Sequence, residues 1–395
     1  MPKLSIEQVD LRDRRVFVRA DLNAPLEGGV VSDDTRLAAV VPTLRRAFEG
    51  GAAVVLASHL GRPKGGRDLK YSLAPVAERM AALLGQPVPL APDCVGAETA
   101  ALAKGLRPGQ ILLLENLRFH PEEEANDDGF ARELASLADC YVNDAFAAAH
   151  RAHASIAAIT RHLQPAAAGL LMKSELEALG RILEAPQRPL VAILGGAKVS
   201  DKVTLVEHLL ERVNALLIGG GMAFTFLHAL GHGVGRSLLE MDRVETARRV
   251  LDGARRRGVQ LVLPVDAVVA PGLDATTGRA VGVRDIPADL MGLDIGPRTV
   301  ERFAAVLKSA GTIVWNGPMG VFERAPFAEG TLGVARAVAS GSAFSVIGGG
   351  DTVAAVNQAG VAERIGYIST AGGAFLEFLE GRALPGVQAL TEATR

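Results

Sequence analysis

Short runs of apolar and β-branched residues alternate along this chain with longer stretches of helical periodicity. This alternation is the sequence feature that most limits which folds the chain can adopt. The strand-like runs lie at residues 16–19, 53–57, 111–114, 140–142, 190–194, 215–218, 260–263, 312–314, 344–347 and 367–369. The helix-like stretches lie at residues 73–84, 130–138, 170–183, 203–213 and 300–309. This pattern predicts βαβ units, which build parallel sheets with helices on both faces.

The length of the chain indicates two domains. Its 395 residues exceed what a single hydrophobic core usually holds. The amphipathic stretch 170–183 lies near the middle and is followed by Pro186. We therefore predict two α/β domains of similar size, at residues 1–169 and 170–374, joined by a hinge helix at 170–183. The last segment, 375–395, could return to the first domain as a second connection.

Charge and composition exclude several classes of protein. The net charge is -2, so no global basic field would hold a nucleic acid, and no polybasic run would hold a membrane. No stretch of eighteen apolar residues and no signal-peptide core occurs. The two cysteines, Cys94 and Cys140, are far apart and fit buried free thiols in a reducing compartment. We expect a soluble, cytoplasmic protein that binds anions through local clusters.

Polar and cationic residues follow every strand of the first half. They are Asp21 and Asn23, then His59 and Arg62, then Arg118, then Arg151, with Arg36 at the start of a helical stretch. The carboxyl ends of parallel strands share one edge of a sheet, so these side chains could converge on a small anion. Arginine offers a planar fork that matches carboxylate and phosphate. Any one of them alone is more often a surface charge, an ion-pair partner or a hydrogen-bonding histidine, and it is the recurrence that favours a pocket.

Glycines follow the strands of the second half. They are Gly195 and Gly196, Gly219–Gly221, Gly348–Gly350, and Gly372 and Gly373. A glycine-rich turn before a helix N-terminus binds phosphate through backbone N–H groups. Lys198 and Lys202 share a face if a helix begins by Lys198. Asp351 reads either as a helix cap or as a Mg²⁺ anchor, and the Walker pattern GxxxxGK[ST] is absent.

Ten motifs, in order, resemble those of one family, phosphoglycerate kinase. They are VFVRADLNAP, SHLGRP, ENLRFH, DAFAAAHRAH, LGGAKVSDK, IGGGMAFTFL, MGLDIGP, VWNGPMGVFE, GGGDT and STAGGAF. The resemblance runs from about residue 16 to 378. It implies a monomeric two-domain enzyme that transfers phosphate between 1,3-bisphosphoglycerate and ADP with Mg²⁺, giving 3-phosphoglycerate and ATP. One departure is Ala371, which stands where the family pattern has the first of three glycines.

The resemblance also implies roles for individual residues. The acid would be held on the N-terminal domain by Asp21, Leu22, Asn23, Arg36, His59, Leu60, Gly61, Arg62, Arg118 and Arg151. The nucleotide would lie along Gly196, Ala197, Lys198, Lys202, Gly292, Asn316, Glu323, Gly349, Gly350, Asp351 and Thr352, with Asp351 close to Mg²⁺. The transferring phosphoryl group would be surrounded by Arg36, Lys198, Lys202, Gly372 and Gly373.

The sequence leaves three other functions open. A different carboxylate kinase would differ only in the acid pocket. A dinucleotide-binding dehydrogenase would need GxGxxG after a strand, a spacing that residues 219–221 lack. A non-catalytic binding protein would not need the two lysines and Asp351. For a kinase, no general base is required because a carboxylate is already ionised at pH 7, so His59 is not expected to act as one.

Overall fold

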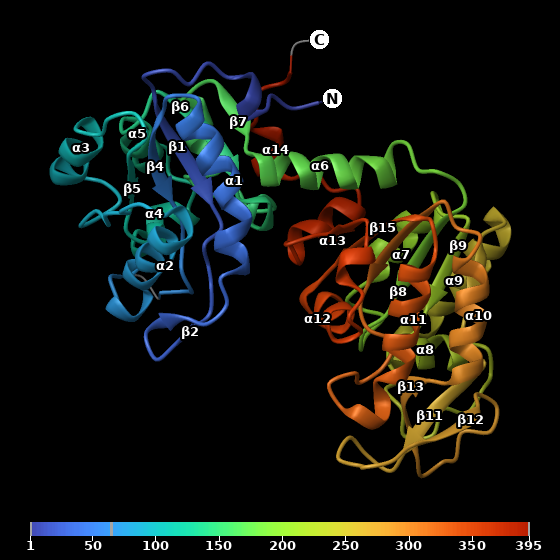
Figure 1. Ribbon diagram of the computed structural model, residues 1–395. Coiled ribbons are helices and arrows are strands. Elements are labelled where there is room, and N and C mark those ends of the chain that lie inside the picture. Colours follow the sequence, from blue (N-terminus) through green and yellow to red (C-terminus); the bar gives the residue numbers. More distant parts are fainter. Residues whose placement is uncertain (1, 64–65, 394–395) are drawn as a thin grey trace. The chain divides into compact units, whose positions relative to one another are not determined.

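The computed structural model in Figure 1 describes residues 2–63 and 66–393. The chain divides into two compact units, one of Met1–Glu177 with Ala383–Arg395, the other of Ala178–Arg382. One crossing between them falls inside helix α6 (Leu170–Leu183), and the other falls after α13 (Gly373–Leu379). The sequence pattern predicted these two changes at residues 170 and 375.

The first unit is built on a five-stranded parallel sheet in the order β5-β4-β1-β6-β7. Its strands are β1 (Arg15–Ala20), β4 (Ala53–Ala57), β5 (Ile111–Leu113), β6 (Cys140–Asp144) and β7 (Ala166–Ala168). The helices around it are α1 (Thr35–Glu49), α2 (Ala74–Leu84), α3 (Ala97–Lys104), α4 (Pro121–Glu124), α5 (Asp128–Ala135) and α14 (Pro385–Gln388) (Figure 1). A hairpin of β2 (Leu26–Glu27) and β3 (Val30–Val31) precedes α1.

The central strands are continuous apolar runs because helices cover the sheet. In β1, Val16, Phe17 and Val18 are fully buried, and Val16 and Val18 belong to the same core cluster as Leu37 and Leu44 of α1. The C-terminal segment joins this unit through backbone pairing, since the Leu4 N–H donates to the Thr391 carbonyl at 2.8 Å. Because β1, β4, β5 and β6 pair in parallel, their carboxyl ends lie at the same edge of the sheet.

The second unit contains a six-stranded parallel sheet in the order β10-β9-β8-β14-β15-β16. Its strands are β8 (Leu190–Leu194), β9 (Ala215–Ile218), β10 (Gln260–Val262), β14 (Thr312–Asn316), β15 (Phe344–Gly348) and β16 (Tyr367–Ile368). The helices are α7 (Val203–Leu210), α8 (Met222–Ala229), α9 (Val244–Arg257), α10 (Pro297–Leu307), α11 (Glu329–Ser340), α12 (Gly350–Gln358) and α13. The predicted α/β class is confirmed, and all ten predicted strands are present with ends within two residues.

The largest part of the fold that was not predicted, beside the short strands β2, β3 and β7, is a second sheet. Beside its parallel sheet, the second unit has a three-stranded antiparallel sheet in the order β12-β11-β13. Its strands are β11 (Asp266–Ala270), β12 (Arg279–Gly282) and β13 (Met291–Ile295). The expectation of one parallel sheet per domain is thus too simple. The reason is that β12 is an edge strand with two exposed residues and carries little apolar signal.

Two further expectations concern the cysteines and the membrane. Cys94 and Cys140 are free and buried, as predicted. Across the described residues, we find no helix with both the length and the apolar character that a membrane crossing requires.

Candidate functional site

In the first unit, the loops after β1, β4 and β5 are tied together at Gly61. The Gly61 N–H donates to Asn23 Oδ1 at 2.8 Å, and its carbonyl accepts from Arg118 Nη1 at 2.7 Å. Gly61 has a φ of +60°, and a Cβ there would lie 2.5 Å from the ring of Tyr71. Only glycine fits this position, so the loop SHLGRP predicted from sequence does bring Asn23 and Arg118 together.

Backbone groups of the predicted loops are held by two side chains that sequence reasoning missed. Ser58 Oγ accepts from the Leu22 N–H at 2.9 Å. Asn116 Nδ2 donates to the Leu60 carbonyl at 2.8 Å, and Asn116 Oδ1 accepts from the Leu60 N–H at 3.3 Å. Each stands next to a motif residue in the sequence, which was the signal available. They fix the backbone from which Asp21 and His59 project.

A buried network lies behind His59. Arg19 is fully buried, donates from Nε to Ser155 Oγ at 2.8 Å and lies 3.2 Å from His59 Nδ1 through Nη2. Glu123 is also fully buried and accepts from the Ser155 hydroxyl at 2.6 Å. Its Oε1 lies 4.0 Å from Arg19 Nη2 and 3.8 Å from His153 Nδ1. Arg19 is therefore a structural residue of this buried ion-pair network.

The charged groups that act on the pKa of His59 show where the cationic cluster lies. Its pKa is held well below the ordinary value, first because burial disfavours the charged imidazolium, then because Arg19, Arg118, His153 and Arg151 act on it. Burial likewise lowers the pKa of His153 to about 3. His59 is thus neutral and surrounded by arginines. This supports the prediction that Arg118 and Arg151 converge near it, and it fits the expectation that His59 is no general base.

Three predicted arginines differ in how they are held. Arg36, in the first turn of α1, donates from Nη1 to Asp21 Oδ2 at 2.9 Å, and its side chain is 40% exposed. Arg151 Nε donates to His150 Nε2 at 3.2 Å. Arg62 is exposed and has no hydrogen bond or ion pair to any residue that the structure describes. Arg36, Arg62 and Arg151 thus keep guanidinium groups that a ligand could engage.

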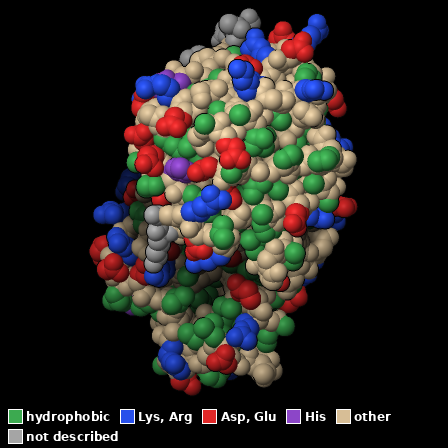
Figure 2. Space-filling model, turned by 90° about the vertical axis from the view of Figure 1, so that its left-hand side faces the viewer, with side chains coloured by type: hydrophobic (Ala, Val, Ile, Leu, Met, Phe, Trp, Pro, Cys, Tyr) green, Lys and Arg blue, Asp and Glu red, His purple; other side chains and the backbone are tan. Residues whose placement is uncertain are grey.

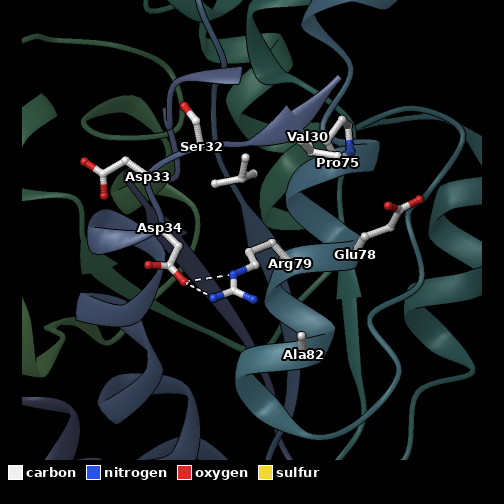
Figure 3. Close-up of a pocket in the computed structure, with 9 residues that line it drawn as sticks. Val30, Ser32, Asp33, Asp34, Pro75, Glu78, Arg79 and Ala82 are labelled. Atoms are coloured by element: carbon white, nitrogen blue, oxygen red, sulfur yellow. Dashed lines mark hydrogen bonds and ion pairs between the residues drawn. The ribbon is translucent and has the colours of Figure 1, made fainter. Parts of the chain in front are cut away.

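A pocket elsewhere in this unit does not match the predicted chemistry. Figure 3 shows it between the β2–β3 hairpin, the start of α1 and α2. Its charged lining is Asp33, Asp34, Glu78 and Arg79, and Arg79 Nε is already bonded to Asp34 Oδ2 at 2.8 Å. Such an acidic surface would repel a phosphorylated acid. We therefore locate the candidate acid site at the arginine cluster.

In the second unit, Lys202 is the centre of the candidate site. Its Nζ donates to Asn316 Oδ1 at 2.5 Å and to the Asn316 carbonyl at 3.1 Å. Among the described residues, no carboxylate lies within ion-pair distance of it. Burial lowers the pKa of Lys202 to about 8, and the charges of Asp201 and Asp351 oppose this shift. A desolvated cation bonded only to amide oxygens is poised to receive an anion.

The loop before α7 differs from the prediction. The helix begins at Val203, so Lys198 lies in the preceding turn and the shared-face argument for Lys198 and Lys202 does not apply. Lys198 is exposed, without a hydrogen bond or ion pair to the described residues. The N–H groups of Val199 and Ser200 donate to Glu240 Oε2 at 2.5 and 3.1 Å. Glu240, a residue that sequence reasoning missed, thus already occupies two donors of this turn.

The glycine turns serve two different purposes. At Gly195, a Cβ would lie 2.0 Å from the Pro318 carbonyl oxygen, and at Gly219 it would lie 2.4 Å from Met319 Sδ. These turns are packed against other loops, so residues 219–221 are not the open phosphate cradle that was predicted. Around Gly350 and Gly372, by contrast, a Cβ would meet nothing within 4 Å. Open space for a ligand thus lies at these two turns.

The turn at the start of α12 carries the predicted metal anchor. Gly349, with a φ of +95°, is the N-cap residue, so the alternative that Asp351 caps the helix is wrong. Asp351 lies in the first turn and is exposed, and it acts electrostatically on Lys202. Thr352 is buried and its Oγ1 accepts from the Gly317 N–H at 2.7 Å. Lys202, Asn316, Asp351 and Thr352 are therefore neighbours.

Other predicted residues lie outside this cluster of direct contacts. Gly292 on β13 donates its N–H to Ser237 Oγ at 2.9 Å and lies against the Phe224 ring. Glu323 is exposed. Among the described residues, Lys202 has no hydrogen bond or ion pair to Gly292, Glu323, Gly372 or Gly373. Ala371 has no positive φ, so its Cβ causes no backbone strain. Arg36 belongs to the first unit, whereas the other four predicted catalytic residues belong to the second.

Comparisons with known proteins agree with the motifs. The family model described as phosphoglycerate kinase matches residues 6–382. A phosphoglycerate kinase of Moorella thermoacetica is 55% identical over 393 residues, covering 99% of this chain and 100% of its own. One of Acidobacterium capsulatum is 55% identical over 403 residues, with the same coverage. The solved structure of phosphoglycerate kinase from Coxiella burnetii has a TM-score of 0.92 at 43% identity, over 98% of each chain.

Proposed function

Because the chain belongs to the phosphoglycerate kinase family, we propose that it transfers a phosphoryl group reversibly between 1,3-bisphosphoglycerate and ADP, giving 3-phosphoglycerate and ATP. It is then a glycolytic kinase that uses a carboxyl group as the acceptor. The relation over nearly the whole chain carries this proposal. The partly buried Lys202, which has no carboxylate partner among the described residues and lies beside the open turn at Gly350, gives it a physical basis.

We place the acid in the first unit. The residues proposed to hold it are Asp21, Leu22, Asn23, Arg36, His59, Leu60, Gly61, Arg62, Arg118 and Arg151. Arg118 and Arg151 act electrostatically on one neutral histidine, and the Gly61 bonds tie the loop after β4 to Asn23 and Arg118. A small acid with a phosphate and a carboxylate would find bidentate donors here, in competition with Asp21, which is paired with Arg36, and with Glu124, which lies 3.1 Å from Arg118 Nε.

The nucleotide belongs to the second unit in this proposal. The residues assigned to it are Gly196, Ala197, Lys198, Lys202, Gly292, Asn316, Glu323, Gly349, Gly350, Asp351 and Thr352. The turn at Gly349 and Gly350, which is open at Gly350, leads into α12, whose first N–H groups can donate to a phosphate. Lys202 stands beside this turn and supplies a positive charge.

The chemistry asks mainly for alignment and for positive charge around the transferring group. The acid carboxylate attacks the γ-phosphoryl in one direction, and the β-phosphate of ADP attacks the acyl phosphate in the other. Arg36, Lys198, Lys202 and the turn of Gly372 and Gly373 are proposed to stabilise the equatorial oxygens. No residue becomes covalently bound. Since the acid lies in one unit and the nucleotide in the other, we infer that transfer follows closure of the two units about α6.

Magnesium is proposed as the metal that accompanies the nucleotide. The exposed carboxylate of Asp351, next to open space at Gly350 and in the electrostatic reach of Lys202, fits a site of one carboxylate with phosphates and water. When bound there, Mg²⁺ would neutralise charge on the nucleotide phosphates. Asp351 would hold it, while Lys202 would remain free for the transferring group.

Asp351→Asn is expected to raise the Mg²⁺ concentration needed for half-maximal rate several-fold, because one anionic ligand is lost. The measurement is a Mg²⁺ titration of the rate at saturating substrates. Asp201→Asn is the matched control, because Asp201 is also exposed and also acts on Lys202 but lies outside the α12 turn. An unchanged titration for Asp351→Asn, or an equal shift for both variants, would remove Asp351 from the metal site.

We also propose that the protein is a cytoplasmic monomer without a nucleic-acid partner. On the face in Figure 2, side chains of both signs are interspersed, which does not favour a polyanion. Two buried free cysteines suit a reducing compartment. Sedimentation equilibrium is expected to give the mass of one chain, and a dimer mass would contradict it.

The reaction itself is tested by a coupled assay. Purified protein is mixed with 1,3-bisphosphoglycerate, ADP and Mg²⁺, and ATP formation is followed through hexokinase and glucose-6-phosphate dehydrogenase. We expect ATP formation that depends on both substrates. Activity with acetyl phosphate or carbamoyl phosphate in place of 1,3-bisphosphoglycerate would indicate a different carboxylate kinase, and no activity with any acyl phosphate would overturn the proposal.

A further inference from the structure

Three side chains that can bind metal meet in the first unit, outside the residues assigned above. They are Asp93, Cys94 and His120, and one ligand atom from each lies within 4.8 Å of the others. Asp93 and Cys94 belong to the loop before α3, whereas His120 precedes α4. We propose that these three side chains form a binding site for a divalent transition-metal ion of the Zn²⁺ type. This proposal does not depend on the proposed function.

The set of donors suits Zn²⁺ by its chemistry. Thiolate, imidazole and carboxylate are the three protein ligand types of zinc, which is usually four-coordinate. In a tetrahedral site, two donors that each lie about 2.0–2.3 Å from the ion are about 3.3–3.8 Å apart. Any pair of these atoms near the 4.8 Å limit would therefore have to move together by about 1 Å to reach bonding distance, with water as the fourth ligand. Mg²⁺, which prefers oxygen, would not favour this set.

The three side chains are already held in place. His120 Nε2 lies 2.7 Å from Asp93 Oδ1, and the His120 ring stacks on Phe130 with the centroids 5.2 Å apart. The Cys94 N–H donates to Asp93 Oδ1 at 2.6 Å, and Thr99 Oγ1 donates to the Asp93 carbonyl at 2.9 Å. A metal ion would take the place of the proton shared by His120 and Asp93. Little conformational freedom would be lost when it binds.

Access and local charge favour a cation. Cys94 is fully buried, but the side chains of His120 and Asp93 are 27% and 40% exposed, so an ion can reach the cluster from that side. Burial raises the pKa of Cys94 well above its ordinary value, and the negative charges of Asp93 and Glu123 add to this. The same negative charges attract a metal ion. On binding, the Cys94 Sγ–H bond breaks, an Sγ–metal bond forms and the proton passes to water.

The ion is tested with Co²⁺, which reports thiolate coordination by a charge-transfer absorption band. Titration of the intact protein with Co²⁺ is expected to produce this band at one equivalent, and Zn²⁺ is expected to abolish it. The metal proposed for Asp351 has no sulfur ligand and would give no such band. The chain offers a matched control, because Cys140→Ser removes the only other cysteine, from β6, and should leave the band unchanged.

The variants decide the assignment. Cys94→Ser should lose the band. His120→Ala alters a partly exposed side chain and should weaken Co²⁺ affinity by at least about tenfold, since even loss of a residue that only orients a metal ligand costs about 10–100-fold. If the Cys94→Ser variant fails to fold, the His120→Ala variant still tests the proposed metal site. The proposal is overturned if wild-type protein gives no thiolate band at saturating Co²⁺, if the band survives in Cys94→Ser, or if His120→Ala binds as tightly as wild type.

Discussion

Replacing Lys202 with alanine is expected to lower kcat by about 10²–10³-fold, the usual loss when one transition-state donor is removed. The cause is the position of Nζ, which is desolvated, bonded only to Asn316 oxygens and next to the open turn of α12. Folding should be little affected, because no carboxylate loses a bonded partner. The measurement is steady-state kinetics in both directions, with thermal unfolding as the check on folding.

A matched control is Lys308→Ala, which removes an exposed lysine from the end of α10 in the same unit. It should leave kcat unchanged. The pH dependence of kcat/KM tests whether the positive charge of Lys202 is required. As pH rises through about 8, ligand-free protein loses the Lys202 proton, so kcat/KM should fall, whereas Lys202→Arg should show no such fall. A near-normal kcat for a folded Lys202→Ala variant would contradict the assignment.

Arg36→Lys is expected to lower kcat on the order of 10²-fold, although the charge is kept. One guanidinium nitrogen of Arg36 donates to Asp21, and the other N–H groups can donate to the ligand. A lysine bonded to Asp21 would be a single point charge and could not also present a planar fork. The measurement is kcat and KM for the acid and for the nucleotide.

The control for Arg36 is Arg62→Lys. Arg62 is exposed and has no partner among the described residues, so its exchange should raise KM for the acid more than it lowers kcat. Two indistinguishable kinetic profiles would mean that Arg36 and Arg62 act alike and that the role of Arg36 is misassigned.

The parallel strands could be predicted because burial on both faces leaves a continuous apolar run in the sequence. β7 shows where this signal ends. Its three alanines have little strand preference, and they form a strand because β6 and Ser5 pair with them. The antiparallel sheet of β11, β12 and β13 was missed for a related reason, since pairing between strands, rather than local sequence, defines it.

The candidate site shows the same limit at the level of single residues. Glu123 stands in the sequence PEEE, which reads as a solvated helix start, yet it is fully buried because Arg19, His153 and Ser155 come to it from distant segments. Glycine pairs were equally ambiguous. Gly219 and Gly350 each follow a strand. The side chain of Met319 fills the space beside Gly219, whereas the space beside Gly350 is open. The polar clusters were predictable from strand ends, whereas the partners that hold them were not.

The central claim is that the acid binds one unit, the nucleotide binds the other, and transfer requires the two units to close. Small-angle X-ray scattering on the full chain tests it most directly, with no ligand, with 3-phosphoglycerate, with Mg²⁺ and ADP, and with all of them together. A ligand shifts such an equilibrium only by its differential affinity for the closed form, so each alone should lower the radius of gyration partly and both together should lower it most. An unchanged radius of gyration with both ligands at saturation would contradict the account.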